Sequence, residues 1–95
     1  MDYVRADPIE EVITSKGRFR ILRLLCRTRE LNISEIARKT NLAYISANQH
    51  LKILKRFGLV EEKTFGRIRI FRYREEDKKC QILKEFFDNC ETIDN

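Results

Sequence analysis

The sequence is poor in the residues and motifs on which most enzymes depend. Its 95 residues include one histidine and three glycines, and they contain neither a nucleophile motif nor a glycine-rich phosphate-binding loop. We therefore predict no catalytic residues and no cofactor, and an enzyme is the least expected class. A chain of this length forms one domain with a small core.

Long hydrophobic runs are missing too. No stretch of 18 apolar residues occurs, so neither a membrane span nor a membrane partner is expected. The first eight residues lack the apolar region of a secretory signal. These two absences predict a cytoplasmic protein.

Cysteines are few and scattered. Cys26, Cys80 and Cys90 do not form the closely spaced framework of a small secreted protein. None belongs to a Cys-x-x-Cys pair, so no metal site is expected. Cys26 falls in a broad apolar segment and is predicted to be a core residue. His50 is predicted either to pack beside the apolar stripe of a helix or to face a phosphate.

Two of the cysteines share one predicted helix. Cys80 and Cys90 lie ten residues apart, which is a rise of about 15 Å. They cannot bond to each other there, because a disulfide needs Cα atoms within about 7 Å. Either one could bridge to a second copy of the chain across a two-fold axis. Buried, reduced thiols are the alternative and the default, since intracellular disulfides are uncommon outside hyperthermophiles.

Charge is abundant but unevenly distributed. Charged residues make up 37% of the chain, and with few glutamines this composition suits a thermophile. Residues 1–74 contain 17 Lys/Arg and 8 Asp/Glu, a net charge of +9, whereas residues 75–95 contain 3 and 7, a net charge of −4. A basic body with an acidic tail indicates a nucleic-acid partner for the body. A solvated surface of mixed charge is the alternative.

The first third of the chain predicts two helices. Asp7 suits a helix cap and Pro8 a first helical position, and residues 9–13 provide a short apolar face. Gly17 interrupts the apolar pattern near an expected junction. A second helix is predicted over residues 18–27, and its apolar residues cover so much of its surface that we expect it at the centre of the domain.

Two short helices separated by a tight turn follow. Asn32 and Glu35 have the spacing of a capping box, which begins a helix that runs to about residue 39. A second helix is predicted over residues 44–56, and Gly58 ends it. Its inward stripe consists of Ala47, Leu51 and Leu54.

The last third predicts a hairpin and a helix. Strands are expected over residues 59–65 and 68–74, and a final helix over residues 76–91. The predicted fold class is mainly α with a small β-hairpin (α+β), a winged helix-turn-helix with a C-terminal dimerisation helix. We place the winged-helix DNA-binding part at residues 1–75 and the dimerisation helix at 76–95, both in one domain.

The second helix of the pair has a polar face opposite its inward stripe. Asn and Gln side chains can donate and accept at adenine, and Ser can bond several base edges, whereas lysines and arginines favour phosphates. An arginine at the hairpin tip can reach a phosphate or a narrow minor groove, although charge can also simply protect an edge strand. The predicted DNA-contacting residues are Tyr44, Ile45, Ser46, Asn48, Gln49, Lys52, Lys55, Arg56, Lys63, Arg67 and Arg69.

The final helix has an apolar stripe too extensive to leave bare. We predict that it forms a homodimer interface, because two-fold symmetry suits a palindromic operator. The alternative is that it folds back onto its own domain. The predicted interface residues are Cys80, Leu83, Phe86, Phe87 and Cys90.

Residues 12–74 resemble the winged-helix repressors of the ArsR and MarR type, most closely ArsR. The segments that carry this resemblance lie at residues 16–25, 33–37, 45–54 and 57–60, and they include the run His-Leu-Lys-x-Leu-x-x-x-Gly-Leu-Val. The resemblance implies a homodimeric transcription regulator that binds through its helix-turn-helix.

The chain departs from the family pattern in two places. Ala43 stands before the recognition helix where the family usually has Ser or Thr, so that helix is expected to lack a side-chain cap. Residues 31–35 contain none of the paired cysteines of metal-sensing members. The resemblance therefore does not imply a sensed ligand.

Three functions follow in order of preference. The first is a homodimeric, sequence-specific regulator of double-stranded DNA, most simply a repressor, with helix 44–56 in the major groove and the wing at 59–74 on the flanking backbone or minor groove. The second is a non-specific, architectural DNA-binding protein. The third is a winged helix that docks other proteins.

Overall fold

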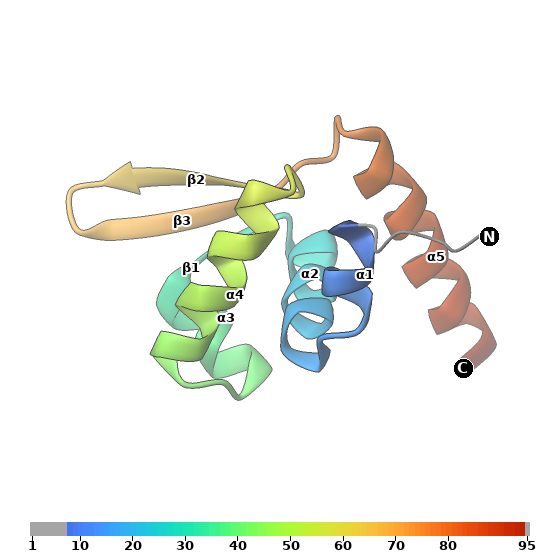
Figure 1. Cartoon of the computed structure of the whole chain (residues 1–95), viewed down its shortest axis with the longest axis horizontal. Helices are drawn as coiled ribbons and strands as arrows, with labels where there is room; N and C mark the ends of the chain where they lie inside the picture. Colours follow the sequence, from blue (N-terminus) through green and yellow to red (C-terminus); the bar gives the residue numbers. More distant parts are fainter. Residues whose placement is uncertain (1–7, 95) are drawn as a thin grey trace, which may run out of the picture.

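The computed structural model describes residues 8–94, and the predicted cap at Asp7 lies outside this range. Five helices and a small sheet form one unit, with the hairpin extending to one side and the last helix lying at the opposite end (Figure 1). This arrangement confirms the predicted class of a mainly α chain with a small β-hairpin. The elements are α1 (Pro8–Ile13), α2 (Lys16–Thr28), β1 (Glu30–Asn32), α3 (Ile33–Thr40), α4 (Tyr44–Arg56), β2 (Val60–Phe65), β3 (Ile68–Tyr73) and α5 (Lys78–Asp94).

The sheet has a third strand that the sequence did not predict. Its order is β1-β3-β2, so β3 is central and both of its neighbours run antiparallel to it. Leu31 of β1 pairs with Phe71, and Glu62 of β2 pairs with the same residue from the other side. A three-residue strand is too short for an alternating pattern, and pairing with β3 alone defines it.

Helix α2 is longer than predicted. Ser15 caps it by accepting a hydrogen bond from the Arg18 amide at 3.3 Å. Gly17 lies inside the first turn, close to the junction between α1 and α2, as the sequence predicted. Ile21, Leu22 and Leu25 are fully buried, which confirms that α2 lies at the centre of the domain.

The α3–α4 pair has the predicted caps and orientation. Asn32 and Glu35 form a reciprocal capping box, in which the Glu35 amide donates to Asn32 Oδ1 at 2.8 Å. Asn41 ends α3 in the left-handed conformation, with φ of 58°. Ala43 precedes α4 without any side-chain cap. The inward stripe is confirmed: Ala47, Leu51 and Leu54 are all fully buried.

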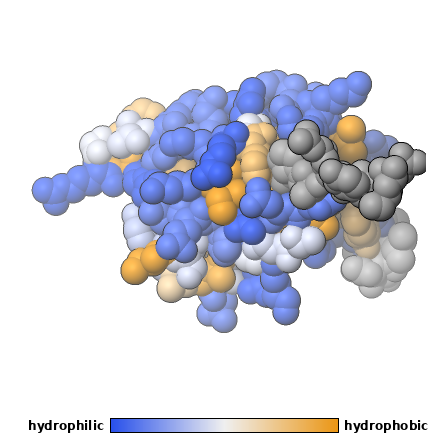
Figure 2. Space-filling view, in the orientation of Figure 1, coloured by the Kyte–Doolittle hydropathy of each residue, from blue (hydrophilic) through white to orange (hydrophobic). Residues whose placement is uncertain are grey.

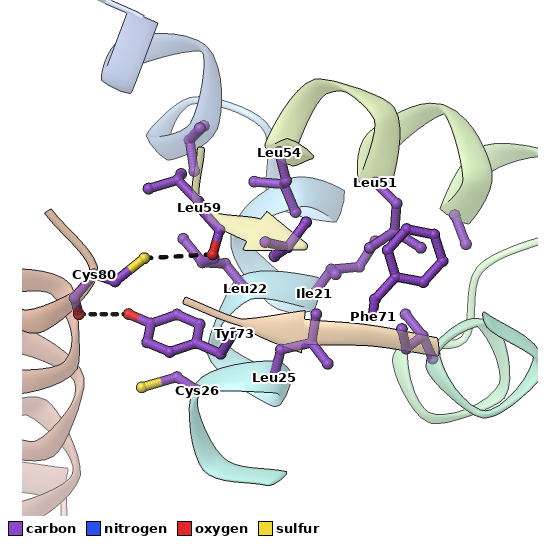
Figure 3. Packing of buried hydrophobic residues seen from close by; sticks show 14 of the residues in the cluster. Ile21, Leu22, Leu25, Cys26, Leu51, Leu54, Leu59, Phe71, Tyr73 and Cys80 are labelled. Carbon is purple, nitrogen blue, oxygen red and sulfur yellow. Dashed lines mark hydrogen bonds between the residues drawn. The ribbon is translucent and has the colours of Figure 1, made fainter. Parts of the chain in front are cut away.

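The core joins α2, α4, the sheet and α5 (Figure 3). Tyr73 at the end of β3 is buried, and its hydroxyl donates to the Cys80 carbonyl at 2.6 Å. The Cys80 thiol donates in turn to the Leu59 carbonyl at 3.4 Å. These two bonds fasten the start of α5 to the base of the hairpin. Burial raises the pKa of Tyr73 above its ordinary value.

Helix α5 begins two residues later than predicted. Asp77 precedes it, and its carboxylate accepts hydrogen bonds from the amides of Lys79 and Cys80 at 2.8 and 3.3 Å. Acidic caps are favourable at this end of a helix. Within residues 8–94 no helix is both long and apolar enough to cross a membrane.

The two sides of α5 have different surroundings. Cys80 and Phe87 are buried within the chain itself, and the Phe87 ring meets Phe19 of α2 edge to face at a centroid distance of 5.3 Å. Ile82 and Phe86 are 58% and 45% exposed. Two of the predicted dimer-interface residues thus lie in the protomer's own core, because one side of α5 packs against its own domain.

Candidate nucleic-acid interface

The outward side of α4 presents the side chains expected of a recognition helix. Ile45 is 71% exposed, and Gln49 and Lys52 are also exposed. Ser46 and Asn48 are half-buried. These residues occupy the first three turns of α4, which is the part of a recognition helix that enters the major groove. Further along, Arg56 is exposed near the C-terminal end of the helix.

The wing tip is a two-residue turn between β2 and β3. Gly66 has φ of +60° while Arg67 does not have a positive φ, and a positive φ at the first central residue alone is the sign pattern of a type II′ hairpin turn. Arg67 and Lys63 are exposed. Phe65 and Ile68 pair across the two strands and are 60% and 55% exposed, so the tip combines cations with apolar side chains.

Arg69 connects the wing to α4. Its Nε donates to Glu62 Oε2 at 2.7 Å, and its Nη1 donates to Asn48 Oδ1 at 2.9 Å. The Tyr44 hydroxyl lies 3.4 Å from the same Nη1. The guanidinium also lies over the Phe71 ring, 5.4 Å from its centroid. Arg69, predicted as a DNA contact, therefore directs its Nε and Nη1 donors to protein acceptors.

Glu62 anchors this arrangement, a role that no local pattern of residues predicted. Its side chain is only 15% exposed, and its second oxygen accepts from Lys55 Nζ at 3.0 Å. The hydrogen bond from Arg69 is the main cause that lowers the pKa of Glu62 below its ordinary value. Carboxylates oppose phosphate binding unless they are neutralised, and here two cations neutralise one.

Several of the predicted contact residues are joined across α4 and the wing. Tyr44 and Asn48 of α4 meet β3 through Arg69, and Lys55 meets β2 through Glu62. A hollow of about 240 Å³ lies where the wing meets the beginnings of α3 and α4. Tyr44, Arg67 and Arg69 are among the residues that line it. Ser34 of α3, which is exposed and was not among the predicted contact residues, lines it too.

His50 belongs to the packing of α4 rather than to its outward side. The ring is half-buried, and Arg18 Nη1 lies 3.2 Å from its Nδ1. A guanidinium can only donate, so Nδ1 must be the acceptor of a neutral imidazole. Burial, and then the charge of Arg18, lower the pKa of His50. The packed-residue interpretation of His50 thus describes its surroundings.

A second feature lies away from the wing, between α1 and α5. An apolar groove of about 390 Å³ is lined by Ile9, Ile13, Lys79, Ile82 and Leu83. Ile13 is 53% exposed. The sequence predicted the contribution of α5 to such a surface but missed that of α1.

The three cysteines are not bonded to one another. Cys26 and Cys80 are buried, and Cys90 is half-buried; all three are free thiols. Burial raises the pKa of Cys80 to about 11 and also raises that of Cys26. Nowhere in the described part of the chain do three or more His, Cys, Asp or Glu residues gather as a metal-binding group.

Hydrophilic residues cover most of the face seen in Figure 2, and the hydrophobic areas on it are small and separate. A three-helix core, a helix-turn-helix with an exposed second helix, and a cationic hairpin beside it define a winged helix-turn-helix domain of the type used by transcription regulators.

The profile of the family described as bacterial regulatory protein, arsR family, matches residues 15–62. The chain belongs to this family of transcription regulators, which confirms the resemblance seen in the sequence. Among curated protein sequences, none is significantly similar to the chain.

Solved structures support the same fold. HlyU from Vibrio cholerae N16961 superposes with a TM-score of 0.76 at 20% identity, over 87% of each chain. NolR from Sinorhizobium fredii gives 0.73 at 17% identity, over 87% of this chain and 80% of NolR. The homodimeric winged helix-turn-helix DNA-binding domain Mb0332 from Mycobacterium bovis gives 0.69 at 26% identity, over 90% of this chain and 74% of that one.

Proposed function

We propose that this chain is a homodimeric repressor that binds a specific sequence in double-stranded DNA. Helix α4 enters the major groove, and the β2–β3 wing lies on the flanking backbone or in the adjacent minor groove. The observation that carries this proposal is the continuity between the outward side of α4 and the wing through Arg69, Asn48 and Glu62. One duplex can contact both parts of such a surface at once.

The residues of this surface divide into two roles. Ile45 and Gln49 project from the first turns of α4, where an apolar side chain can meet a thymine methyl and an amide can read a base edge. Lys52, Arg56 and Arg67 are exposed cations that suit phosphates. Sequence preference should therefore depend on the first set, and general affinity on the second.

The dimer is proposed to form through α1 and α5. The exposed Ile13, Ile82 and Phe86 and the groove between these helices leave an apolar surface at the end of the molecule farthest from the wing (Figure 1). A homodimer with a two-fold axis there would place two α4 helices in successive major grooves, about 34 Å apart. Residues 76–95 would then act as the dimerisation segment beside a DNA-binding part at 1–75.

The test is selection of bound duplexes from a random pool, followed by gel-shift titration of two variants against the selected site. Gln49→Ala should change the preferred sequence, because it removes a base-reading group. Arg67→Ala should weaken binding to all duplexes and make the dependence on salt shallower by about one counterion.

Two results would contradict the proposal. If neither substitution altered affinity or preference, α4 and the wing would not be the contact surface. If the selected and random duplexes bound equally well, the protein would be an architectural DNA-binding protein instead. Failure to bind any duplex at low salt would point to a protein-docking winged helix. Repression itself is tested by a reporter whose promoter carries the selected site.

A further inference from the structure

The arrangement of Asn48 has a consequence for the kind of base that α4 can read. Asn48 Oδ1 lies 2.9 Å from Arg69 Nη1. A guanidinium has five donors and no acceptor, so the atom that faces it must be the amide oxygen and not the nitrogen. The orientation of the Asn48 side-chain amide is thus determined by its partner.

The other half of the amide is available. In the described part of the chain the Asn48 Nδ2 group donates to no protein acceptor, and it is not among the buried polar atoms that lack a partner. The amide plane places Nδ2 on the side opposite to Oδ1. Asn48 therefore offers its surroundings two donors, while its amide oxygen is turned toward Arg69.

Arg69 is held firmly enough to impose this orientation. Glu62 binds Arg69 Nε at 2.7 Å and is itself only 15% exposed. Phe71 packs below the guanidinium at 5.4 Å. Charge-assisted hydrogen bonds of this kind are about twice as strong as those between neutral groups. The guanidinium is therefore fixed by the wing before any DNA arrives.

We propose that Arg69 is a specificity-determining positioning residue that orients Asn48 so that it presents its amide donors to DNA. This inference rests on the proposed function. Asparagine pairs with adenine by accepting from N6 while donating to N7, and that pair requires the amide oxygen and nitrogen to face the base together. With Oδ1 turned toward Arg69, Asn48 matches base edges that present acceptors. Guanine, with O6 and N7, and thymine, with O4, are then preferred over adenine at the base pair facing Asn48.

The test compares variants of equal charge by the base that each prefers at one position of the DNA site. Selection of duplexes with the Asn48→Ala variant first identifies this position, because it is the base pair at which the variant no longer prefers one base. Arg69→Lys keeps the positive charge but cannot bind Glu62 and Asn48 as a fork. We expect this variant to bind adenine there about tenfold better relative to guanine or thymine than the wild type does.

Two further variants separate this role from a merely structural one. Glu62→Gln loosens Arg69 and removes a negative charge, so it should raise affinity for every duplex while lowering discrimination at the same position. In the Asn48→Ala background, Arg69→Lys should leave the base preference at that position unchanged. Arg67→Lys at the wing tip is the matched control and should not alter the preference. Circular dichroism verifies that each variant is folded.

The outcomes are distinct. A wild-type preference for adenine at this position, or an identical preference in Arg69→Lys, would overturn the inference while leaving sequence-specific binding intact. Absence of binding to any duplex would overturn the proposed function, and this inference with it. Relaxed discrimination that depends on Asn48 would support it.

Discussion

The backbone of Gly17 in α2 lies directly against the imidazole ring of His50 in α4. A Cβ atom added to Gly17 would lie 2.8 Å from His50 Cδ2 and closer still to Nε2. Real Cβ atoms essentially never approach so closely, so the ring would have to move. The glycine therefore lets α2 approach α4 closely.

This contact predicts that Gly17→Ala destabilises the domain, although alanine is the better helix former. Displacing the ring from its place beside Arg18 should cost about 1–3 kcal/mol, more than the gain in helix propensity of at most about 1 kcal/mol. Urea unfolding measures the difference. In a His50→Ala background the same substitution should become neutral or stabilising. If Gly17→Ala is equally harmful with and without the ring, the steric explanation is wrong.

The pKa of His50 predicts a pH dependence of stability. Its folded-state pKa is lowered below the ordinary 6.5, mainly by burial, so the unfolded chain binds a proton more readily. Stability should be full above about pH 6.5 and should fall as pH decreases through the folded-state pKa, by less than about 1.4 kcal/mol per pH unit.

The measurement is urea unfolding between pH 7.5 and 5, with His50→Gln as the control that should show a shallower slope. The carboxylates whose pKa is lowered are Glu62 and Glu76, from 4.5 and in Glu76 to about 2, and Asp77, from 3.8. They lose their contribution only as pH falls below about 4.5, outside this window. A slope unchanged in His50→Gln would show that another group titrates.

The hydrogen bond from Tyr73 to the Cys80 carbonyl predicts a cost for Tyr73→Phe. The hydroxyl is buried and the bond measures 2.6 Å, so its loss should destabilise the protein by about 1–2 kcal/mol. Phenylalanine keeps the ring volume, which separates the bond from the packing. Denaturant unfolding gives the value, and amide exchange in the first turn of α5 should increase. Wild-type stability in Tyr73→Phe would mean that α5 is held by packing alone.

The uncapped beginning of α4 predicts a stabilising substitution. Ala43 has φ of −64° and ψ of 150° and no side-chain hydrogen bond, a conformation in which serine can accept from the next turn. Ala43→Ser should raise the free energy of unfolding by about 0.5–1 kcal/mol. Ala43→Gly, which offers no side-chain acceptor, is the control and should gain less than serine does. Equal effects of the two substitutions would argue against capping.

The groove between α1 and α5 predicts the effect of a charge placed there. Ile82 is 58% exposed in the protomer, so Ile82→Asp should leave the fold intact while disrupting an apolar interface. Sedimentation should show a shift from dimer toward monomer, together with a loss of operator affinity. Gln81→Asp, an exposed neighbour outside the groove lining, should remain dimeric. A dimer that survives Ile82→Asp must use another surface.

Much of the fold could be predicted because its signals are local. The capping box of Asn32 and Glu35 lies within four residues, and the stripe of Ala47, Leu51 and Leu54 repeats within one helix. The turn at Gly66 needs only a residue that tolerates a positive φ. Each of these features is decided by neighbours in sequence, so it is visible without a structure.

What the sequence by itself determined is therefore the order of the elements, the outward side of α4 and the cationic wing tip. Only the tertiary structure decided which side of α5 is buried, that β1 pairs with β3, and that Arg69 turns to Asn48 and Glu62 instead of to solvent. Those outcomes depend on contacts between residues far apart in the chain. A side chain's chemistry limits the partners it can accept, but the packing of distant elements selects one of them.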